Sequence, residues 1–541
     1  MSSHFKWYPS EDEAIVPWNA RYSFPSQANS ATKMTPRLPP KNGATFIPGE
    51  PIRLEFPAQG YVNMLNTTLE FDVTLCGYQT SAGEITRFQN NIQSIFSRVR
   101  LLYGATPLED IPHYNVITRA LTEWTCTNQN GTMDQTSITD GIGGVVFGSG
   151  SDALVGLINV RQNYIQGVSS TLFTGASPVN FLNGDGSNAV PNRANAVTGF
   201  TVTSGAFYCT RRYSVSLGLG LFIQDKLVPT KFMASALALE ITLENAQSCI
   251  FSIPGTSSGI PPTYAVGNVN LIPEILVFDA SYDAMFLKGL QDGGVPIKFS
   301  SWHTFFFSTQ KASTMMLNIQ ERSRSVKAIF AIQRRSPSTF DTDSHAFLYD
   351  SSTIDNLNGN SMQNFQFRIG GRYFPAAPVQ LSITPGSGVP NGGAEAFSEL
   401  QKSLNIVGDY RLSSSVNTNR WAIPVSTTSN LGTTQPELDY CCSIIDFDSL
   451  GHPKVAAVSV ASLTIGNAFA GNQGSCCFAM STNLETSNGV EISGLNAEEQ
   501  NDIALNIQWR NPQSDTNVIE AYVFYDAMIV LKENNVLELI Q

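Results

Sequence analysis

The sequence predicts an all-β protein with a few short helices, and three observations support this prediction. Segments in which apolar and polar residues strictly alternate recur along the chain. Turn-rich loops separate these segments, whereas a βαβ fold would place long helices between them. Only 14% of the 541 residues are charged, well below the roughly 25% of an average globular protein, and uncharged polar residues replace them.

Five segments carry the strand signal. In residues 67–75 the apolar side chains Leu69, Phe71 and Val73 alternate with polar ones, which predicts a strand with one buried face. The same alternation is found in residues 212–219, 237–245 and 503–511. Residues 326–333 form a continuous apolar run, which is typical of a strand that is covered on both faces.

Three segments have helical patterns. Thr106-Pro107 is a favourable helix start, and it predicts a helix that carries apolar residues at mixed three- and four-residue spacings, namely Ile111, Val116, Ile117, Leu121 and Trp124. A second helix is expected in residues 394–404. A third, in residues 281–294, ends at Gly293-Gly294 and lies near the middle of the chain, where a domain junction would fall.

The length predicts at least two domains, at roughly 100 to 200 residues each. We expect an extended arm in residues 1–45, rich in proline and aromatic residues, then domains in residues 46–289 and 290–541. Residues 125–200 are dense in Gly, Asn, Ser and Thr and predict a long surface excursion. The sequence Tyr-Asp-Ala-Met occurs at 282–285 and at 525–528, which gives weak support for two similar halves.

Charge and targeting signals narrow the classes of function. The net charge is −12 and basic runs are missing, so we expect no direct sequence-specific nucleic-acid binding. The chain lacks a secretory signal pattern and an 18-residue apolar window, which predicts an intracellular protein without a membrane span. The eight cysteines are expected to be reduced and mostly buried, including the adjacent pairs Cys441-Cys442 and Cys476-Cys477.

The sequence contains few patterns that are typical of catalytic, phosphate-binding or metal-binding sites. The five histidines are scattered without metal-ligand spacing, and residues 341–345 and 446–452 resemble polar turns more than calcium loops. The glycine-rich stretches at 141–150 and 217–222 lack the phosphate-binding patterns, so we interpret their glycines as turn and packing residues. A catalytic triad that assembles only in space is left open. We expect no catalytic, cofactor-binding or metal-binding residues, and no enzyme.

Three segments in order resemble one protein family. They are residues 94–125, residues 217–246, and residues 365–381 with the helix that follows. Within the third, Arg368 to Gly371 leads to Tyr373-Phe374-Pro375. The paired glycines predict a β-bulge or a close backbone approach, where a Cβ would clash or force an unfavourable dihedral angle. Together these segments resemble the double jelly-roll major capsid proteins of polinton-like viruses and virophages.

This resemblance implies two tandem eight-stranded antiparallel jelly rolls, in residues 46–289 and 290–541. It further implies homotrimers that form pseudo-hexagonal capsomers and tile an icosahedral shell around a DNA genome. The implied partners are other copies of the chain, neighbouring capsomers, penton and minor capsid proteins, and an internal membrane contacted by the arm. No cofactor is implied. The protein would belong to the virion and would be made and assembled inside the host cell.

An alternative is a carbohydrate-binding or glycan-cleaving β-sandwich protein. Such a protein needs exposed aromatic platforms and, for cleavage, two nearby carboxylates. Four tryptophans lie within or beside apolar patterns, which favours burial in a core: Trp124, Trp302, Trp421 and Trp509. An extracellular adhesin is disfavoured because a secretory signal is missing.

Overall fold

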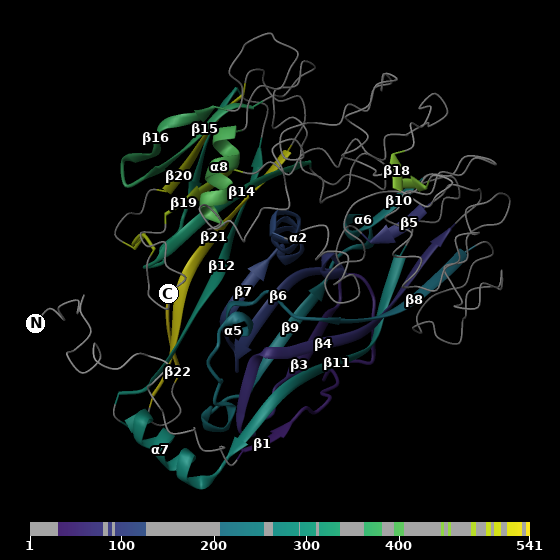
Figure 1. Ribbon diagram of the computed structural model, residues 1–541, viewed down its shortest axis with the longest axis vertical. Coiled ribbons are helices and arrows are strands. Elements are labelled where there is room, and N and C mark those ends of the chain that lie inside the picture. Colours follow the sequence, from purple (N-terminus) through teal and green to yellow (C-terminus); the bar gives the residue numbers. More distant parts are fainter. Residues whose placement is uncertain are drawn as a thin grey trace, which may run out of the picture.

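Four antiparallel sheets of four or five strands dominate the computed structural model (Figure 1). The structure describes residues 31–78, 85–88, 92–125, 206–253, 263–291, 293–309, 313–335, 362–380, 394–404, 445–447, 453–455, 478–482, 494–498, 503–509, 517–532 and 537–541. No helix within these ranges is long and apolar enough to cross a membrane.

The first half of the chain forms two packed sheets. One contains, in spatial order, β1 (Ala31–Met34), β11 (Thr263–Phe278), β4 (Tyr61–Tyr78) and β8 (Ala206–Val215), with β2 (Thr45–Phe46) also on β11. The other contains β3 (Pro51–Glu55), β9 (Leu237–Leu243), β6 (Phe96–Tyr103) and β7 (Thr106–Pro112). The sheets bury their facing side chains, as the rings of Phe71 on β4 and Phe96 on β6 show at 5.6 Å between centroids.

The second half repeats this arrangement. One sheet contains β12 (Val295–Thr309), β21 (Asn517–Leu531), β14 (Val326–Arg335) and β19 (Phe478–Ser481), with β22 (Leu537–Ile540) also on β21. The other contains β13 (Thr314–Ile319), β20 (Ile503–Trp509), β15 (Met362–Ile369) and β16 (Arg372–Gln380).

The two halves share one topology. When the main strands of each half are numbered one to eight along the chain, with β1 and β2 together as the first, both halves have the sheet orders 1-8-3-6 and 2-7-4-5. Two four-stranded sheets connected in this way form a jelly roll. The predicted fold class, two tandem antiparallel jelly rolls with a few short helices, is therefore confirmed.

Shorter elements complete the described residues. Two two-stranded antiparallel sheets pair β5 (Ile85–Phe88) with β10 (Ile250–Ile253), and β17 (Ile445–Phe447) with β18 (Pro453–Val455). The α-helices are α2 (Tyr114–Thr125), α5 (Gly220–Ile223), α6 (Ala246–Cys249), α7 (Ala280–Gln291) and α8 (Ala394–Ser403). Two 3₁₀ turns, η2 (Ile92–Ile95) and η6 (Thr230–Phe232), connect strands.

All five predicted strand segments lie in or overlap strands, namely β4, β8, β9, β14 and β20. The apolar run of β14 is buried on both faces, as the sequence indicates, because α8 packs on β14 and β19 from one side. Ala396 and Leu400 of α8 are fully buried there. The predicted helices in residues 281–294 and 394–404 correspond to α7 and α8.

The predicted helix from Thr106 is wrong in its first third. Thr106–Pro112 forms β7, and the helix begins only at Tyr114. β7 pairs with β6 on one side alone, so it is an edge strand. An edge strand tolerates prolines because its outer N–H groups have no ladder partner, and Pro107 therefore mimics a helix start.

The Tyr-Asp-Ala-Met repeat is not a structural repeat. Its first copy lies in helix α7, whereas its second copy lies within strand β21. The duplication is one of topology instead. Of the expected arm, residues 31–34 and 45 lie in strands β1 and β2, and residues 1–30 lie outside the described residues. Nearly all of the expected surface excursion, from residue 126 onward, also lies outside them.

Gly370 and Gly371 form the two-residue turn of the β15–β16 hairpin, since Ile369 pairs with Arg372. Their φ angles are +53° and +81°, as the favoured two-residue hairpin turn requires. A Cβ on Gly371 would meet no atom within 4 Å. The two glycines therefore form no bulge, and Gly371 makes no close approach. The expectation that another residue would have an unfavourable dihedral angle here is confirmed.

We predict that Gly371→Val lowers the free energy of unfolding by about 1 to 3 kcal/mol, because a β-branched residue is strained at positive φ. Gly371→Asn is the matched control and should cost less, since asparagine tolerates the left-handed region. Urea unfolding of both variants checks this. Equal losses in the two variants would show that the dihedral angle is not the cause.

Candidate functional site

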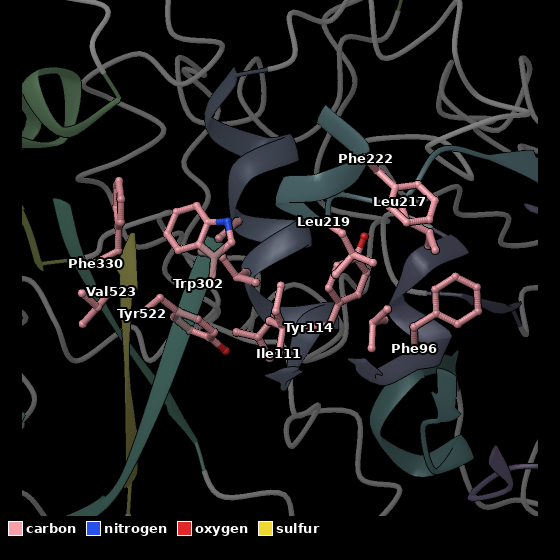
Figure 2. Packing of buried hydrophobic residues seen from close by; sticks show 14 of the residues in the cluster. Phe96, Ile111, Tyr114, Leu217, Leu219, Phe222, Trp302, Phe330, Tyr522 and Val523 are labelled. Carbon is pink, nitrogen blue, oxygen red and sulfur yellow. The ribbon is translucent and has the colours of Figure 1, made fainter. Parts of the chain in front are cut away.

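The two jelly rolls meet at a junction of buried side chains. Helix α5 and strand β7 of the first jelly roll meet β12 of the second there. His113, which precedes α2, meets β21. Figure 2 shows buried side chains from both sides: Phe96, Ile111, Tyr114, Leu217, Leu219 and Phe222 from the first, and Trp302, Phe330, Tyr522 and Val523 from the second. They belong to one continuous core cluster, so burial of apolar surface joins the two jelly rolls.

A buried carboxylate connects three elements at this junction. Oε2 of Glu109 on β7 accepts hydrogen bonds from the Gly220 N–H and the Ser301 hydroxyl, each at 2.7 Å. Oε1 accepts one from the Leu221 N–H at 2.8 Å. These donors belong to α5 and to β12 of the other jelly roll. Burial raises the pKa of Glu109, and the three donors partly oppose that rise.

Gly220 allows α5 to approach β12. A Cβ at this position would lie 2.0 Å from the carbonyl oxygen of Ser300, closer than any real contact. The glycine-rich segment 217–222 therefore does not cradle a ligand with its backbone. Its N–H groups are used within the junction, since Gly218 donates to the Tyr114 hydroxyl at 2.7 Å and Gly220 donates to Glu109.

His113 forms a second bridge. It lies between β7 and α2 with φ +52°, and its carbonyl accepts a hydrogen bond from the Tyr522 hydroxyl at 3.1 Å. Its Nδ1 lies 3.3 Å from Oε1 of Glu520, which is fully buried on β21. The imidazole stacks on Phe306 of β12, with ring centroids 5.7 Å apart. The turn before α2 is thus held by two neighbouring strands of the second jelly roll, β12 and β21.

A further buried carboxylate, that of Glu321, lies beside the junction. Glu321, which is almost fully buried, accepts hydrogen bonds from the N–H groups of Arg322 and Ser323 at 2.8 Å, and lies 2.9 Å from Nδ1 of His303. Burial would raise the pKa of Glu321, but the interactions with His303 and Ser323 outweigh it and hold that pKa below 4.5. The His303 ring in turn packs on Tyr525 at 4.0 Å between centroids.

The junction residues hold the two jelly rolls together, and the described ones form neither a catalytic triad nor a metal site. The His303–Glu321 pair has the form of an oriented imidazole, yet no serine or cysteine within the described ranges is hydrogen-bonded to that ring. No group of three or more His, Cys, Asp or Glu side chains could hold a metal in the described part of the chain. Residues 341–345 lie outside it, and of residues 446–452 only Asp446 and Phe447, on β17, lie inside.

The candidate residues of the alternative functions can be placed in part. Trp302 and Trp509 are buried, so neither offers a platform to a sugar. The side chains of Trp124 and Trp421 lie outside the described residues. Cys249 is buried and free, as expected. Both adjacent cysteine pairs fall outside the description.

Sequence reasoning missed Glu109, His113 and Glu520. Glu520 is flanked by apolar residues inside strand β21, and Glu109 lies between buried Leu108 and Ile111. An acidic residue in such a run indicates a buried, hydrogen-bonded carboxylate and could have served as a signal. The hydrogen-bond partners of Glu109, namely Gly220 and Ser301, could not be inferred, because they lie 111 and 192 residues further along the chain.

Comparisons with known proteins support the fold. No protein-family model and no curated protein matches the chain. The structure of the mavirus major capsid protein matches with a TM-score of 0.51 and 8% sequence identity, over 100% of this chain and 95% of that one. The Sputnik virophage structure (TM-score 0.47, identity 11%, coverage 98% and 92%) and the PBCV-1 capsid (0.47, 8%, 96% and 99%) are less similar. The mavirus match confirms the double jelly-roll fold that the resemblance implied.

We predict that Gly220→Ala lowers the free energy of unfolding by on the order of 3 kcal/mol, because the new methyl group must push α5 away from β12. The matched control is Gly289→Ala in α7, where the nearest atom to a Cβ is 3.8 Å away. Urea denaturation checks both variants. A Gly220→Ala protein as stable as the control would show that the close approach is unimportant.

The acid dependence of stability should depend on Glu321. Its folded-state pKa is lowered, so its contribution to stability is complete above pH 4.5 and is lost as the pH falls through the folded-state value. Glu321→Gln should therefore reduce the loss of unfolding free energy below about pH 4.5. Glu498→Gln, at an exposed carboxylate, is the control. Identical pH profiles for wild type and Glu321→Gln would contradict this prediction.

Proposed function

We propose that this chain is a viral major capsid protein whose function lies in its association surfaces. The observation that carries the proposal is the pair of jelly rolls of identical topology, joined by a buried junction and matched over the full length by the mavirus major capsid protein. The proposed domains are an arm in residues 1–45 and jelly rolls in residues 46–289 and 290–541. The protein is not an enzyme in this proposal and needs no cofactor.

The sheet edges support association of copies with one another. In the first jelly roll the fifth strand, β7, is an edge strand that packs against the first strand of the second jelly roll, β12. The fifth strand of the second jelly roll, β16, contacts helix α8 but does not pack against a strand of another jelly roll in the described chain. Tyr373 and Phe374 are 49% and 37% exposed, and Ala376, Ala377 and Pro378 are exposed beside them. An apolar strip of this kind is typical of a protein interface.

Both fifth strands carry prolines, which determine how they can associate. β7 contains Pro107 and Pro112, and β16 contains Pro375 and Pro378. Proline lacks an N–H donor, so neither edge can extend its sheet by a continuous hydrogen-bonded ladder. β7 is indeed covered through side chains and single hydrogen bonds, such as that from the Thr304 hydroxyl to the Pro112 carbonyl at 3.2 Å.

Strand β1, near the N-terminal end of the chain, is the proposed partner of β16. β1 is the first strand of the first jelly roll, equivalent to β12, and all four of its residues are exposed. Docking of β16 onto the β1 edge of a second copy would form, between two chains, the same kind of contact that β7 and β12 form within one chain. Such a heterologous contact forms a ring when its rotation closes, and three copies give a ring of six jelly rolls. This supports the homotrimeric, pseudo-hexagonal capsomer.

The capsomers in turn are proposed to tile an icosahedral shell around a DNA genome. Neighbouring capsomers, penton proteins and minor capsid proteins are the proposed partners, and an internal membrane is a proposed contact of the arm. The protein resides in the virion after synthesis and assembly in the host cell. Direct binding to the genome is not part of the proposal, because the chain carries a net charge of −12.

Sedimentation tests the ring. We predict a particle of three times 58.8 kDa at micromolar concentration, and dissociation by the double variant Tyr373→Ser, Phe374→Ser, since both side chains lie on the proposed interface. Met316→Ser, at a similarly exposed apolar residue of β13, is the control and should leave the trimer intact. A wild-type monomer would contradict the trimer, and an intact double variant would contradict the assigned edge.

Electron microscopy of concentrated protein separates the capsid function from its alternative. The proposal expects three-fold particles that associate into curved sheets or closed shells. A glycan-binding protein would instead remain dispersed and be retained on immobilised polysaccharide.

A further inference from the structure

Helix α7 is the covalent connection between the two jelly rolls. It follows β11 of the first and precedes β12 of the second, and in Figure 1 it lies at the lower end of the molecule. β12 begins at Val295, six residues before Ser301, which binds Glu109 at the junction. At about 3.3 Å per residue along a strand, these two positions on β12 are about 20 Å apart. The helix therefore lies at a second place where the two jelly rolls are connected.

A small core at α7 forms a cluster of its own. Its four buried members come from both jelly rolls and from the helix: Tyr61 and Phe232 from the first jelly roll, Leu290 from α7, and Leu531 from the second jelly roll. The Tyr61 ring makes edge-to-face contacts with the rings of Tyr282 and Phe286 of α7, each at 5.4 Å between centroids. Burial of apolar surface thus joins the two jelly rolls through the helix.

Asp283 anchors the first turn of α7 to the first jelly roll. Its Oδ1 accepts a hydrogen bond from the Tyr61 hydroxyl at 3.0 Å, and its Oδ2 forms an ion pair with the Lys231 ammonium group. The Asp283 side chain is 16% exposed, so this anchor is partly shielded from water. Burial and the neighbouring Asp283 raise the pKa of Tyr61, which keeps its hydroxyl protonated as a donor. A carboxylate bound from two sides fixes where the helix begins.

Close packing fixes the other end of α7 to the second jelly roll. Leu290 is 4% exposed and shares the small core with Leu531, the last residue of β21. Gly294 follows the helix with φ +95°, and a Cβ there would lie 2.8 Å from the Leu531 carbonyl oxygen. Its N–H donates to the Gly289 carbonyl at 3.3 Å. The two ends of this twelve-residue helix are thus held by different jelly rolls.

A connection of this kind differs from a hinge. Segments between two domains normally allow movement, because a few residues there absorb the change in backbone angles. A helix that is held at both ends has no such freedom, since its backbone is fixed by its own hydrogen bonds. If the Glu109 junction were the only contact, the jelly rolls could tilt about it. Tilting about one of two separated contacts has to break the other.

We propose that α7 is a strut that sets the angle between the two jelly rolls, with Asp283 as the positioning residue at its first end. Loss of the Asp283 carboxylate removes the acceptor that Tyr61 and Lys231 share. The first end of the helix is then released, while the packing of Leu290 remains. The two jelly rolls tilt about the Glu109 junction, and each stays folded around its own core. The inference concerns a single chain and does not depend on the proposed capsid function.

Distances between two spin labels test the strut in the full-length protein. One label is attached at Ala105, in an exposed turn of the first jelly roll, and the other at Thr314, which is exposed on β13 of the second. Labelled chains are diluted into unlabelled ones, so that only distances within one chain are measured. Asp283→Asn should broaden the distance distribution roughly twofold, because more orientations become populated. An unchanged distribution would overturn the proposal.

Glu399→Gln is the matched control. The Glu399 side chain of α8 is 13% exposed and pairs with Lys402, much as Asp283 pairs with Lys231, but this ion pair lies within one helix. The control should leave the distance distribution as narrow as that of wild type. Equal broadening in the control and in Asp283→Asn would show a general loosening of the protein and would also overturn the proposal.

Variants of Lys231 test the same anchor from a residue whose side chain is 45% exposed, so folding is retained. Lys231→Gln should broaden the distance distribution, whereas Lys231→Arg should keep it narrow, because a guanidinium group also binds a carboxylate. Hydrogen exchange separates the strut from a general effect on stability. In Lys231→Gln the amides of α7 should exchange several-fold faster, while those of β9 and β20 keep their rates. Equal distributions for the two variants, or equal acceleration in helix and strands, would overturn the proposal.

Discussion

The carboxylate of Glu109 fixes the position of one jelly roll against the other, because its hydrogen-bond donors come from both. Two are N–H groups of α5 in the first jelly roll, and the third is the Ser301 hydroxyl of the second. A buried carboxylate is costly unless its oxygens are satisfied, so any sliding of β12 past β7 would leave it unpaired. Apolar burial alone tolerates such sliding. The combination of apolar core and directional bonds gives the chain one geometry.

A single geometry within the chain is what a ring of jelly rolls requires. If β16 and the β1 edge of the next copy repeat the contact between β7 and β12, errors in the angle between the two halves would add up around the ring and prevent closure. Gly220 contributes here as much as Glu109 does, since only a residue without a Cβ lets α5 approach the Ser300 carbonyl. His113, bound to Tyr522 and stacked on Phe306, adds a second fixed point.

Much of the fold could be predicted from the sequence, because alternation along a strand directly reports which side chains are buried. The alternating apolar residues of β4 and β20 are buried as predicted, although Asp72, Thr74 and Ala504, which lie between them, are buried too. The continuous run of β14 indicates cover on both faces. Sequence signals whose meaning depends on which elements lie nearby in the fold were misleading. Proline is favourable at a helix start and acceptable on an edge strand, so Pro107 could not distinguish them until β7 was known to be an edge. The Tyr-Asp-Ala-Met repeat likewise lacked the context that assigns one copy to α7 and the other to β21.

The junction could not be predicted in the same way, because its bonds join residues that are far apart along the chain. Its glycines were correctly interpreted as packing residues, yet the surface against which Gly220 packs belongs to the other jelly roll. The prolines of β7 show how a local signal misleads at an edge strand. If β16 binds a second copy, as proposed, it has to expose an apolar edge, and an exposed edge invites uncontrolled sheet extension. Prolines on such an edge suppress the hydrogen-bonded ladder and leave the side chains available, so a residue type that obscures the local secondary structure at β7 would also favour ordered assembly at β16.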